Sequence, residues 1–210
     1  MINLSIVIPC FNEAKSLSKL VKDFSKKLKR RDVELILVNN GSNDSSETIL
    51  LNLKKNYNFL KTIRLKKNNG YGNGVLQGLK KAKGQYISWT HADLQTDPYD
   101  VIIGFEKFEK ELSPKIFIKG NRLGRPLKDI VFTIGMSIFE TILLKNFFWD
   151  VNAQPNIFHK NFFNMLERIP LDFSFDLFFY FNAKKKNLKI LRFSVKYPER
   201  KFGVSHWNTD

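Results

Sequence analysis

Cysteine and acidic residues are scarce in this chain. Cys10 is the one cysteine among 210 residues, so no disulfide can form within the chain, which indicates a reducing compartment. Its place at the end of an apolar segment indicates a small packing residue rather than a nucleophile. Asp and Glu number 20 against 35 Lys and Arg, which gives a net charge of +15. Such an excess suits phosphate-rich partners, namely nucleic acid, anionic lipid headgroups or a nucleotide diphosphate.

A hydrophobic run long enough to cross a bilayer, about 20 apolar residues, is also missing. The longest apolar run, residues 130–144, contains Glu140 and is too short to span. Two interpretations of this run stay open. It is either a buried helix, or a helix that lies in a membrane interface with Lys128, Lys145 and the aromatic residues 147–149 at its rims.

The N-terminus carries no leader pattern. Met1 is followed almost at once by the apolar segment 4–8, so we expect no signal peptide. Together with the lone cysteine, this predicts a cytoplasmic protein, with peripheral attachment to the cytoplasmic face of a membrane as the alternative.

Strand-like and helix-like segments alternate over the first 120 residues. The pattern predicts strands at 4–9, 33–38, 59–65, 85–89 and 116–118, and helices at 13–30, 45–53, 74–83 and 98–112, followed by a helix around 177–181 and a strand at 188–195. This alternation predicts an α/β protein with a mostly parallel central sheet flanked by helices. Because no repeat or linker interrupts it, we expect a single domain over residues 1–210.

Polar clusters follow four of the expected strands. They occupy residues 9–13, 39–42, 90–95 and 119–122. Ligands bind outside the carboxyl ends of the strands in parallel sheets. We therefore expect these clusters to converge on one edge of the sheet.

The cluster at 90–95 has the chemistry of a metal site. Asp93 follows the apolar segment 85–89, and a buried carboxylate is costly unless a cation or hydrogen bonds compensate it. Asp93 and Gln95 both offer oxygen atoms, which Mg²⁺ and Mn²⁺ prefer as ligands. A loop aspartate is otherwise typical of a helix cap, and Asp97 before Pro98 fits that role better.

Two further segments suit a nucleotide. In residues 38–46, Gly41 permits a tight turn, and the surrounding amide and hydroxyl groups can recognise a base edge or a ribose. In residues 68–74, the glycines, Gly70 and Gly72 among them, let backbone amides approach a phosphate.

In order and spacing, the segments 5–13, 38–46, 68–74 and 90–98 resemble the family 2 glycosyltransferases of the GT-A fold. The resemblance covers residues 4–208 and is nearest to the dolichyl-phosphate mannose synthase-like branch. It implies an α/β GT-A fold and an inverting, metal-dependent transfer of a sugar from a nucleotide-diphosphate sugar, with UDP or GDP as the nucleotide.

The resemblance also implies a donor site. Its nucleotide-sugar contacts would be Pro9, Phe11, Glu13, Asn39, Asn40, Ser42, Gly70, Gly72 and Asp93. Asn39 and Asn40 stand where the family usually has aspartates that recognise base and ribose, so the base preference is open. The family's Asp-X-Asp motif is His91-Ala92-Asp93 here, which makes Asp93, Gln95 and His91 the expected ligands of Mg²⁺ or Mn²⁺. His91 could instead pair with a phosphate or be structural.

On the acceptor side, the resemblance implies phosphate-binding residues and further catalytic residues. The expected phosphate contacts are Lys119, Arg122, Arg200, Ser205 and His206. The expected catalytic residues are Asp93, Arg122, Arg200 and Asp176. Asp176 and Asp150 are candidates for the general base that a hydroxyl acceptor would need. Asp172 is either a catalytic carboxylate or a helix cap.

These features predict a transferase whose acceptor is a polyprenyl-phosphate lipid. The first alternative is transfer to the hydroxyl of a glycan or lipopolysaccharide intermediate. A second alternative is a non-catalytic binding subunit of a glycosylation complex, which the replaced motif residues His91, Asn39 and Asn40 would suit. Nucleic-acid binding is not expected, because the chain lacks a recognition motif for it.

Overall fold

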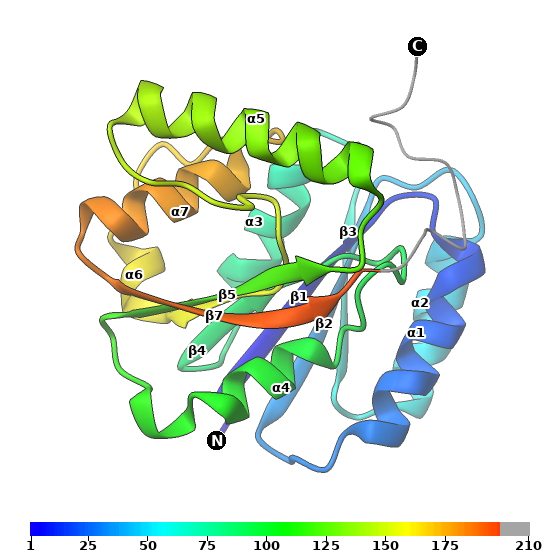
Figure 1. Cartoon of the computed structure of the whole chain (residues 1–210). Coiled ribbons are helices and arrows are strands. Elements are labelled where there is room, and N and C mark those ends of the chain that lie inside the picture. The colour runs from blue at the N-terminus through cyan, green and yellow to red at the C-terminus, as the bar shows by residue number, and fades with distance from the viewer. Residues whose placement is uncertain (198–210) are drawn as a thin grey trace.

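A computed structural model describes residues 1–197 of the chain, and its seven strands form one sheet in the order β3-β2-β1-β4-β6-β5-β7 (Figure 1). The strands are β1 Leu4–Cys10, β2 Val33–Asn40, β3 Leu60–Leu65, β4 Tyr86–Trp89, β5 Ile116–Leu123, β6 Asn156–His159 and β7 Lys189–Lys196. Strand β6 runs antiparallel to both of its neighbours, and the other paired strands are parallel. The predicted mostly parallel α/β sheet is confirmed.

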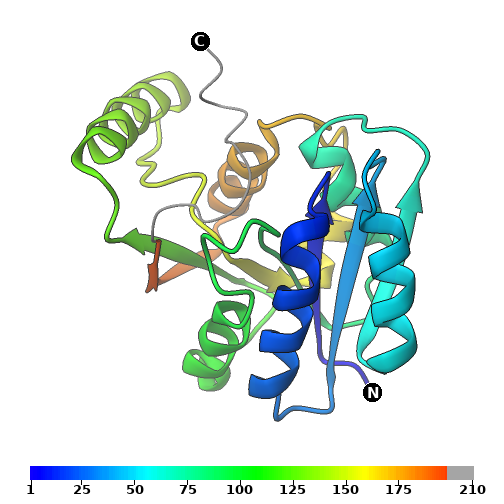
Figure 2. The same cartoon turned by 90° about the vertical axis from the view of Figure 1, so that its right-hand side faces the viewer.

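Helices cover both faces of the sheet (Figures 1 and 2). Helices α1 Ala14–Lys27, α2 Ser46–Asn56 and α4 Asp100–Lys107 contribute to one apolar core. Helices α3 Tyr71–Lys81, α6 Lys160–Asn164 and α7 Phe175–Lys185 contribute to the core on the opposite face. A short 3₁₀ helix, Glu109–Glu111, follows α4, and helix α5 Leu127–Leu144 follows β5.

The sequence patterns explain these layers. Strand β1 is almost entirely buried, which matches its unbroken apolar run and its place between β2 and β4. In α1, Leu17, Leu20, Val21 and Phe24 recur at helical spacing and are buried together against the sheet. Periodicity therefore located these elements correctly.

Several boundaries differ from the sequence prediction. Helix α3 begins at Tyr71 rather than residue 74, and α4 covers Asp100–Lys107 rather than 98–112. Strand β5 continues to Leu123, because residues 119–122, expected in a turn, pair with β7 as far as Leu123 opposite Lys196. Much of the expected acceptor segment thus lies in a rigid strand.

Helix α5 buries polar side chains and exposes apolar ones. Its buried residues are Thr133, Ser137 and Glu140, whereas apolar side chains such as Phe132 and Ile142 are 68% and 72% exposed. The interpretation of this run as a buried helix is therefore wrong. Within residues 1–197, no helix is both long enough and apolar enough to cross a membrane.

Gly78 tests how closely α3 packs on the sheet. A Cβ atom at this position would lie 2.2 Å from Cγ1 of Val7 and 3.0 Å from Cγ2 of Val38. Alanine normally favours a helix over glycine by about 1 kcal/mol, but overpacking a core costs about 1–3 kcal/mol. We expect Gly78→Ala to lower the free energy of unfolding measured in urea.

Gly135 provides the matched control for this prediction. It lies in helix α5, and a Cβ atom there would meet nothing within 4 Å. Gly135→Ala should therefore raise the free energy of unfolding by up to about 1 kcal/mol. Equal effects of the two substitutions would contradict the close packing of α3 on β1.

Candidate active site at the carboxyl ends of the strands

The loops that follow β1 and β2 are bound to each other. The backbone N–H of Asn12 donates to Oγ of Ser42 at 3.0 Å, and that of Glu13 donates to Oγ of Ser46 at 3.1 Å. In return, Oδ1 of Asn12 accepts from the backbone N–H of Asn43 at 2.9 Å. Asn12 has a φ of 56°, a left-handed conformation that asparagine tolerates better than most residues. The two predicted nucleotide segments therefore form one unit.

Asn39 and Asn40 end strand β2, and both are buried. Oδ1 of Asn39 accepts from the backbone N–H of Ser42 at 2.9 Å, which closes the turn at Gly41. Nδ2 of Asn40 donates to the carbonyl of Gly70 at 3.0 Å. Asn40 thus joins the end of β2 to the glycine segment.

The glycines of residues 70–74 are required by packing. Gly70 has a φ of 100°, and a Cβ atom on it would lie 2.4 Å from the carbonyl oxygen of Leu171. Gly72 lies inside α3, where a Cβ atom would lie 2.8 Å from the backbone of Leu171 and Asp172. This gives both glycines a structural reason, and their contact with a nucleotide stays a prediction.

The expected metal loop leaves β4 at the same edge of the sheet. Oδ1 of Asp93 accepts from the backbone N–H of Gln95 at 3.1 Å, and Oε1 of Gln95 accepts from the hydroxyl of Tyr197 at 3.1 Å. The His91 ring lies 5.7 Å from the ring of Tyr71, the residue that follows Gly70. Asn40, Gly70, Tyr71 and His91 therefore form a continuous path from the end of β2 to the loop after β4.

The donor set of this loop suits an open magnesium or manganese site. It offers one carboxylate, one amide oxygen and one imidazole, and no three His, Cys, Asp or Glu side chains of residues 1–197 gather into a complete metal cage. Magnesium usually takes one or two carboxylates and completes its coordination with water and substrate phosphates. Asp93, Gln95 and His91 fit that pattern.

Arg122 and Asp150 form a buried ion pair beside this edge. Nε of Arg122 lies 2.8 Å from Oδ1 of Asp150, the second guanidinium nitrogen Nη2 also contacts Oδ1, and the backbone N–H of Arg122 donates to Oδ2 at 3.0 Å. Burial acts to raise the pKa of Asp150, but the hydrogen bonds and charge of Arg122 outweigh it and hold that pKa below its usual value. Asp150 is therefore poorly suited to act as a general base.

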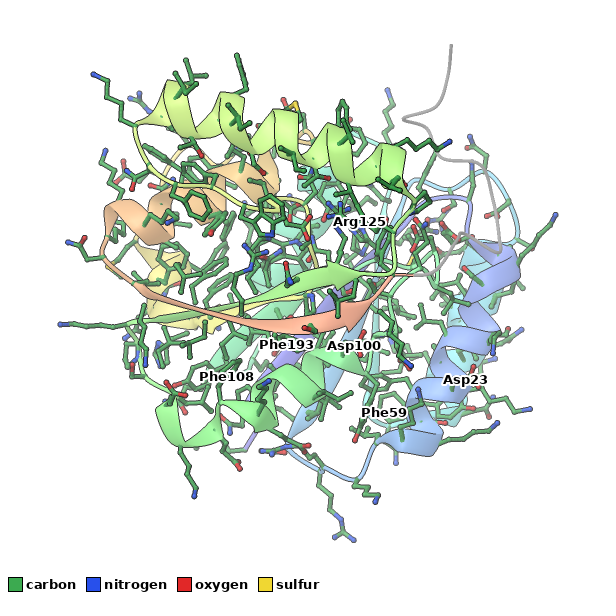
Figure 3. The ribbon with its side chains drawn as sticks, viewed as in Figure 1. Asp23, Phe59, Asp100, Phe108, Arg125 and Phe193 are labelled. Atoms are coloured by element: carbon green, nitrogen blue, oxygen red, sulfur yellow. The ribbon has the colours of Figure 1, made fainter. Side chains whose placement is uncertain are left out.

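Two more guanidinium groups lie beside Asp150. Nη1 of Arg125 is 3.6 Å from its carboxylate, and Arg192 donates to the carbonyls of Trp149 and Gly120 at 2.5 and 2.7 Å. Arg125 lies where β5 passes into α5 (Figure 3). Its side chain is 5% exposed, and its Nε atom is buried with no hydrogen-bond partner in the described part of the chain. Positive charge is thus in local excess.

Lys119 and Asp176, two predicted site residues, are also buried. Nζ of Lys119 donates to the carbonyl of Ala153 at 2.7 Å and to Oδ1 of Asn156 at 2.8 Å. Burial lowers the pKa of Lys119 to about 7, although the charge of Asp176 opposes this shift. Oδ1 of Asp176 accepts from the side chains of Trp89, Gln154 and Asn156.

The remaining predicted residues divide into two groups. Pro9, Phe11 and Glu13 are half-buried at the end of β1 and in the loop after it. Asp172 is exposed and accepts from the backbone N–H of Ser174 at 2.9 Å, in the turn before α7. The N-cap residue of α7 is Ser174. Arg200, Ser205 and His206 lie outside the described residues.

Sequence reasoning missed several residues that the structure brings together. They are Tyr71, Trp89, Gln154 and Asn156 around Asp176, and Arg125 and Arg192 around Asp150. Gln154 and Asn156 on either side of Pro155 were a usable signal, because two amides beside an apolar strand need buried partners.

Known proteins share both the sequence pattern and the fold. The model of a family described as glycosyl transferase family 2 matches residues 5–171. The chain belongs to glycosyl transferase family 2. A poly-beta-1,6-N-acetyl-D-glucosamine synthase of Staphylococcus epidermidis is 30% identical over 129 residues, which are 58% of this chain and 31% of that protein. An uncharacterized glycosyltransferase of Rickettsia typhi is 30% identical over 133 residues, 55% of this chain and 40% of its own length.

Solved structures confirm the predicted GT-A fold of this family 2 domain. A glucosyl-3-phosphoglycerate synthase from Mycobacterium tuberculosis, in complex with Mn²⁺, UDP and glucosyl-3-phosphoglycerate, matches with a TM-score of 0.73 at 13% identity. The match covers 96% of this chain and 73% of that one. Staphylococcus aureus TarS matches with a TM-score of 0.66 at 17% identity, over 93% of this chain and 60% of the other. Similarity to one branch of the family, the dolichyl-phosphate mannose synthase-like branch, stays a prediction.

The Arg122–Asp150 pair yields a prediction for stability. Removing one member of a buried ion pair costs about 3–5 kcal/mol, because the other charge is left uncompensated. We expect Asp150→Asn to lower the free energy of unfolding at pH 7 by about 3 kcal/mol, measured in urea. Asp23→Asn, on the exposed face of α1, should change it by less than about 0.5 kcal/mol.

The same pair should respond to acid. Because the pKa of Asp150 is lower in the folded state, its contribution is complete above the unfolded value of about 3.9 and is lost as the pH falls through the folded value. The difference between wild type and Asp150→Asn should thus be constant from pH 7 to pH 5 and should narrow below about pH 4. A difference that widens in acid would contradict the pairing.

Proposed function

We propose that this family 2 protein transfers a sugar from a nucleotide-diphosphate sugar to a phosphate-bearing acceptor, a polyprenyl phosphate, with inversion and with the help of Mg²⁺ or Mn²⁺. One observation carries the proposal. The interlocked loops after β1 and β2 and the Asp93 loop occupy one edge of the sheet, and the sheet continues from there to a buried cluster of three guanidinium groups.

The donor would occupy the edge formed by β1, β2 and β4. Asp93, Gln95 and His91 would hold the divalent cation, which would stabilise the negative charge of the leaving diphosphate. Ser42 and the asparagines at the end of β2 offer hydroxyl and amide groups close to the β1 loop, where a base or ribose could be recognised. Manganese and UDP in the mycobacterial neighbour support this assignment of the metal and nucleotide classes.

The acceptor assignment rests on charge. Three guanidinium groups lie around Asp150. Those of Arg122 and Arg125 face its carboxylate, and that of Arg192 donates to its backbone carbonyl at 3.4 Å. An acceptor phosphate would balance this excess, and arginine is well suited to bind phosphate oxygens in pairs. A phosphate oxygen is already an anion, so it needs no general base to attack the anomeric carbon. An acceptor that needs no base agrees with the burial of both candidate bases, Asp150 and Asp176.

The outer face of α5 supports a lipid-linked acceptor. We define this apolar face as the exposed side chains Leu127, Val131, Phe132, Ile134, Met136, Ile138, Phe139, Ile142 and Leu143. Lys128 and Lys145 flank it and are also exposed. A helix with this composition suits the interface of an anionic membrane, where apolar burial and lysine attraction add together. The chain would then associate peripherally with a membrane that holds the lipid.

Transfer to a hydroxyl group is the second candidate. The names of the similar proteins support it, since one relative is a synthase of poly-beta-1,6-N-acetyl-D-glucosamine, and the chain spans only 31% of that protein. Such an acceptor would need a base. Comparing a short polyprenyl phosphate with a soluble oligosaccharide as acceptor separates the two candidates.

Asp93 gives the direct test of the proposed chemistry. Hydrolysis and transfer would be measured over a panel of UDP- and GDP-sugars, with Mn²⁺, Mg²⁺ or a chelator. With the active donor, Asp93→Ala should lower transfer on the order of 100-fold or more, because it removes the carboxylate ligand that supports the leaving charge. Asp23→Ala is the control and should behave as wild type. Undiminished wild-type activity in excess chelator would contradict metal dependence.

The membrane association has its own test, flotation with vesicles. We expect the wild type to float with vesicles that contain anionic lipid and to float less with neutral ones, since each surface lysine contributes about 1 kcal/mol. The double variant Phe132→Asp and Ile142→Asp should stay at the bottom of the gradient. Leu51→Asp, an apolar residue 49% exposed on α2, is the control and should float. If the double variant floats as well as the wild type, the apolar face of α5 is not the surface that binds the membrane.

A further inference from the structure

Asp176 is the meeting point of a buried network of side chains. Its Oδ1 atom accepts from Nε2 of Gln154 at 2.6 Å, from Nδ2 of Asn156 at 2.9 Å and from Nε1 of Trp89 at 3.2 Å. The Tyr71 oxygen joins the network by accepting from Nε2 of Gln154 at 3.4 Å. Asp176 itself is 4% exposed. Three donors from outside its own helix therefore converge on one carboxylate oxygen.

The residues of the network come from different parts of the fold. Trp89 ends β4, two residues before His91 in the expected metal loop. Tyr71 is the first residue of α3 and follows Gly70. Gln154 belongs to the segment between Asp150 and β6, and Asn156 begins β6. Asp176, on α7, thus links the metal loop, the glycine segment and the acceptor-side segment.

The amide groups have a single consistent orientation. Nζ of Lys119 donates to Oδ1 of Asn156, so Nδ2 of Asn156 is left to donate to Asp176 and to Oε1 of Gln154 at 2.8 Å. That contact in turn directs Nε2 of Gln154 toward Asp176 and the Tyr71 oxygen, the latter at 3.4 Å. The network runs from the buried amino group of Lys119 to the buried carboxylate of Asp176, and both amide groups donate and accept along the way.

The aromatic rings carry this order to the edge of the site. Burial, assisted by the negative charge of Asp176, raises the pKa of Tyr71, so its phenol stays protonated and remains a donor. Its ring stacks on Phe173 with centroids 5.7 Å apart and packs beside His91. The Trp89 ring is enclosed by Phe158, Phe175 and Phe179.

We propose that Asp176 is a positioning residue and not the general base: it holds the metal loop, the glycine segment and the segment 150–154 in one arrangement. This inference rests on the proposed function for its kinetic consequence, but its structural consequence does not depend on any substrate. Asp176 accepts its hydrogen bonds from protein side chains, whereas a general base would need to reach the proton of the acceptor.

Two substitutions at this position separate the two roles. Asp176→Asn keeps an oxygen that can accept from Gln154, Asn156 and Trp89 but cannot accept a proton from an acceptor. Asp176→Leu has a similar size and removes the oxygen that accepts from Gln154, Asn156 and Trp89. A base is lost equally in both variants, whereas a positioning residue is largely rescued in the first.

Amide hydrogen exchange, followed by mass spectrometry, would measure the positions directly. We expect Asp176→Leu to speed exchange in residues 70–74, 89–95 and 150–156, and Asp176→Asn to leave these segments close to wild type. Gln154→Leu, a milder variant in case Asp176→Leu does not fold, should speed exchange in 70–74 and 150–156 only, because Trp89 keeps its contact with Asp176. Asp23→Leu and Asp23→Asn are the matched surface controls.

Transfer kinetics, with the donor found by the screen, give the second readout. Asp176→Asn should keep kcat within about tenfold of wild type, the effect of weakening one hydrogen-bonded group. Asp176→Leu should lower kcat on the order of 100-fold, the cost of a misplaced site. Equal loss of kcat in both variants, with exchange unchanged in the three segments, would overturn the inference and make Asp176 the base. Faster exchange confined to α7 would overturn it as well. If the wild type transfers no sugar, the proposed function fails, and the exchange pattern still decides the role of Asp176.

Discussion

The direction of strands β1, β2 and β4 is the constraint on which the rest of the site depends. β1 lies between the other two and is parallel to both, so the loops after Cys10, Asn40 and Trp89 must leave the sheet at the same edge. Beyond the last paired residue of each strand, the backbone N–H and C=O groups have no partner in a neighbouring strand. The chain satisfies several of them with side chains of the neighbouring loops, and those polar side chains belong to the proposed donor site.

The proposed acceptor side depends on a different interaction, the compensation of buried charge. Asp150 is fully buried and is acceptable there because Arg122 and the adjacent backbone supply its hydrogen bonds. The inner face of α5 takes part, since Ser137 and Thr133 contact Asp150 and Arg125. Glu140 lies on the same inner face, where burial raises its pKa to about 7 and Lys119 opposes the shift. Because the inner face of α5 is polar, the apolar residues of this helix lie on its exposed outer face.

Local pattern was sufficient for the elements whose burial follows one period. The alternation of apolar runs and helical stripes located β1, β2 and α1, and the strand-end rule placed the β1, β2 and β4 loops together. It placed the start of α3 at Gly74 rather than Tyr71, because Gly72 suggested a loop, whereas Gly72 is a helical residue packed against residues 171–172. It left two interpretations of α5 open, since the composition of a helix does not say which side the protein covers. The roles of Gln154 and Asn156 depend on contacts with Lys119 and Asp176, far away in sequence, and no local rule reveals those contacts.

The central claim is that a nucleotide and a divalent cation bind at the shared edge of β1, β2 and β4. Paramagnetic broadening by Mn²⁺ in an amide NMR spectrum, recorded with UDP or GDP present, tests it directly. The account predicts that broadening is confined to amides near residues 10–13, 39–43 and 91–95, and that it weakens when the nucleotide is omitted. Broadening centred instead on the opposite edge, around Ile2, Arg30 and Phe59, or spread evenly over the basic surface, would contradict it.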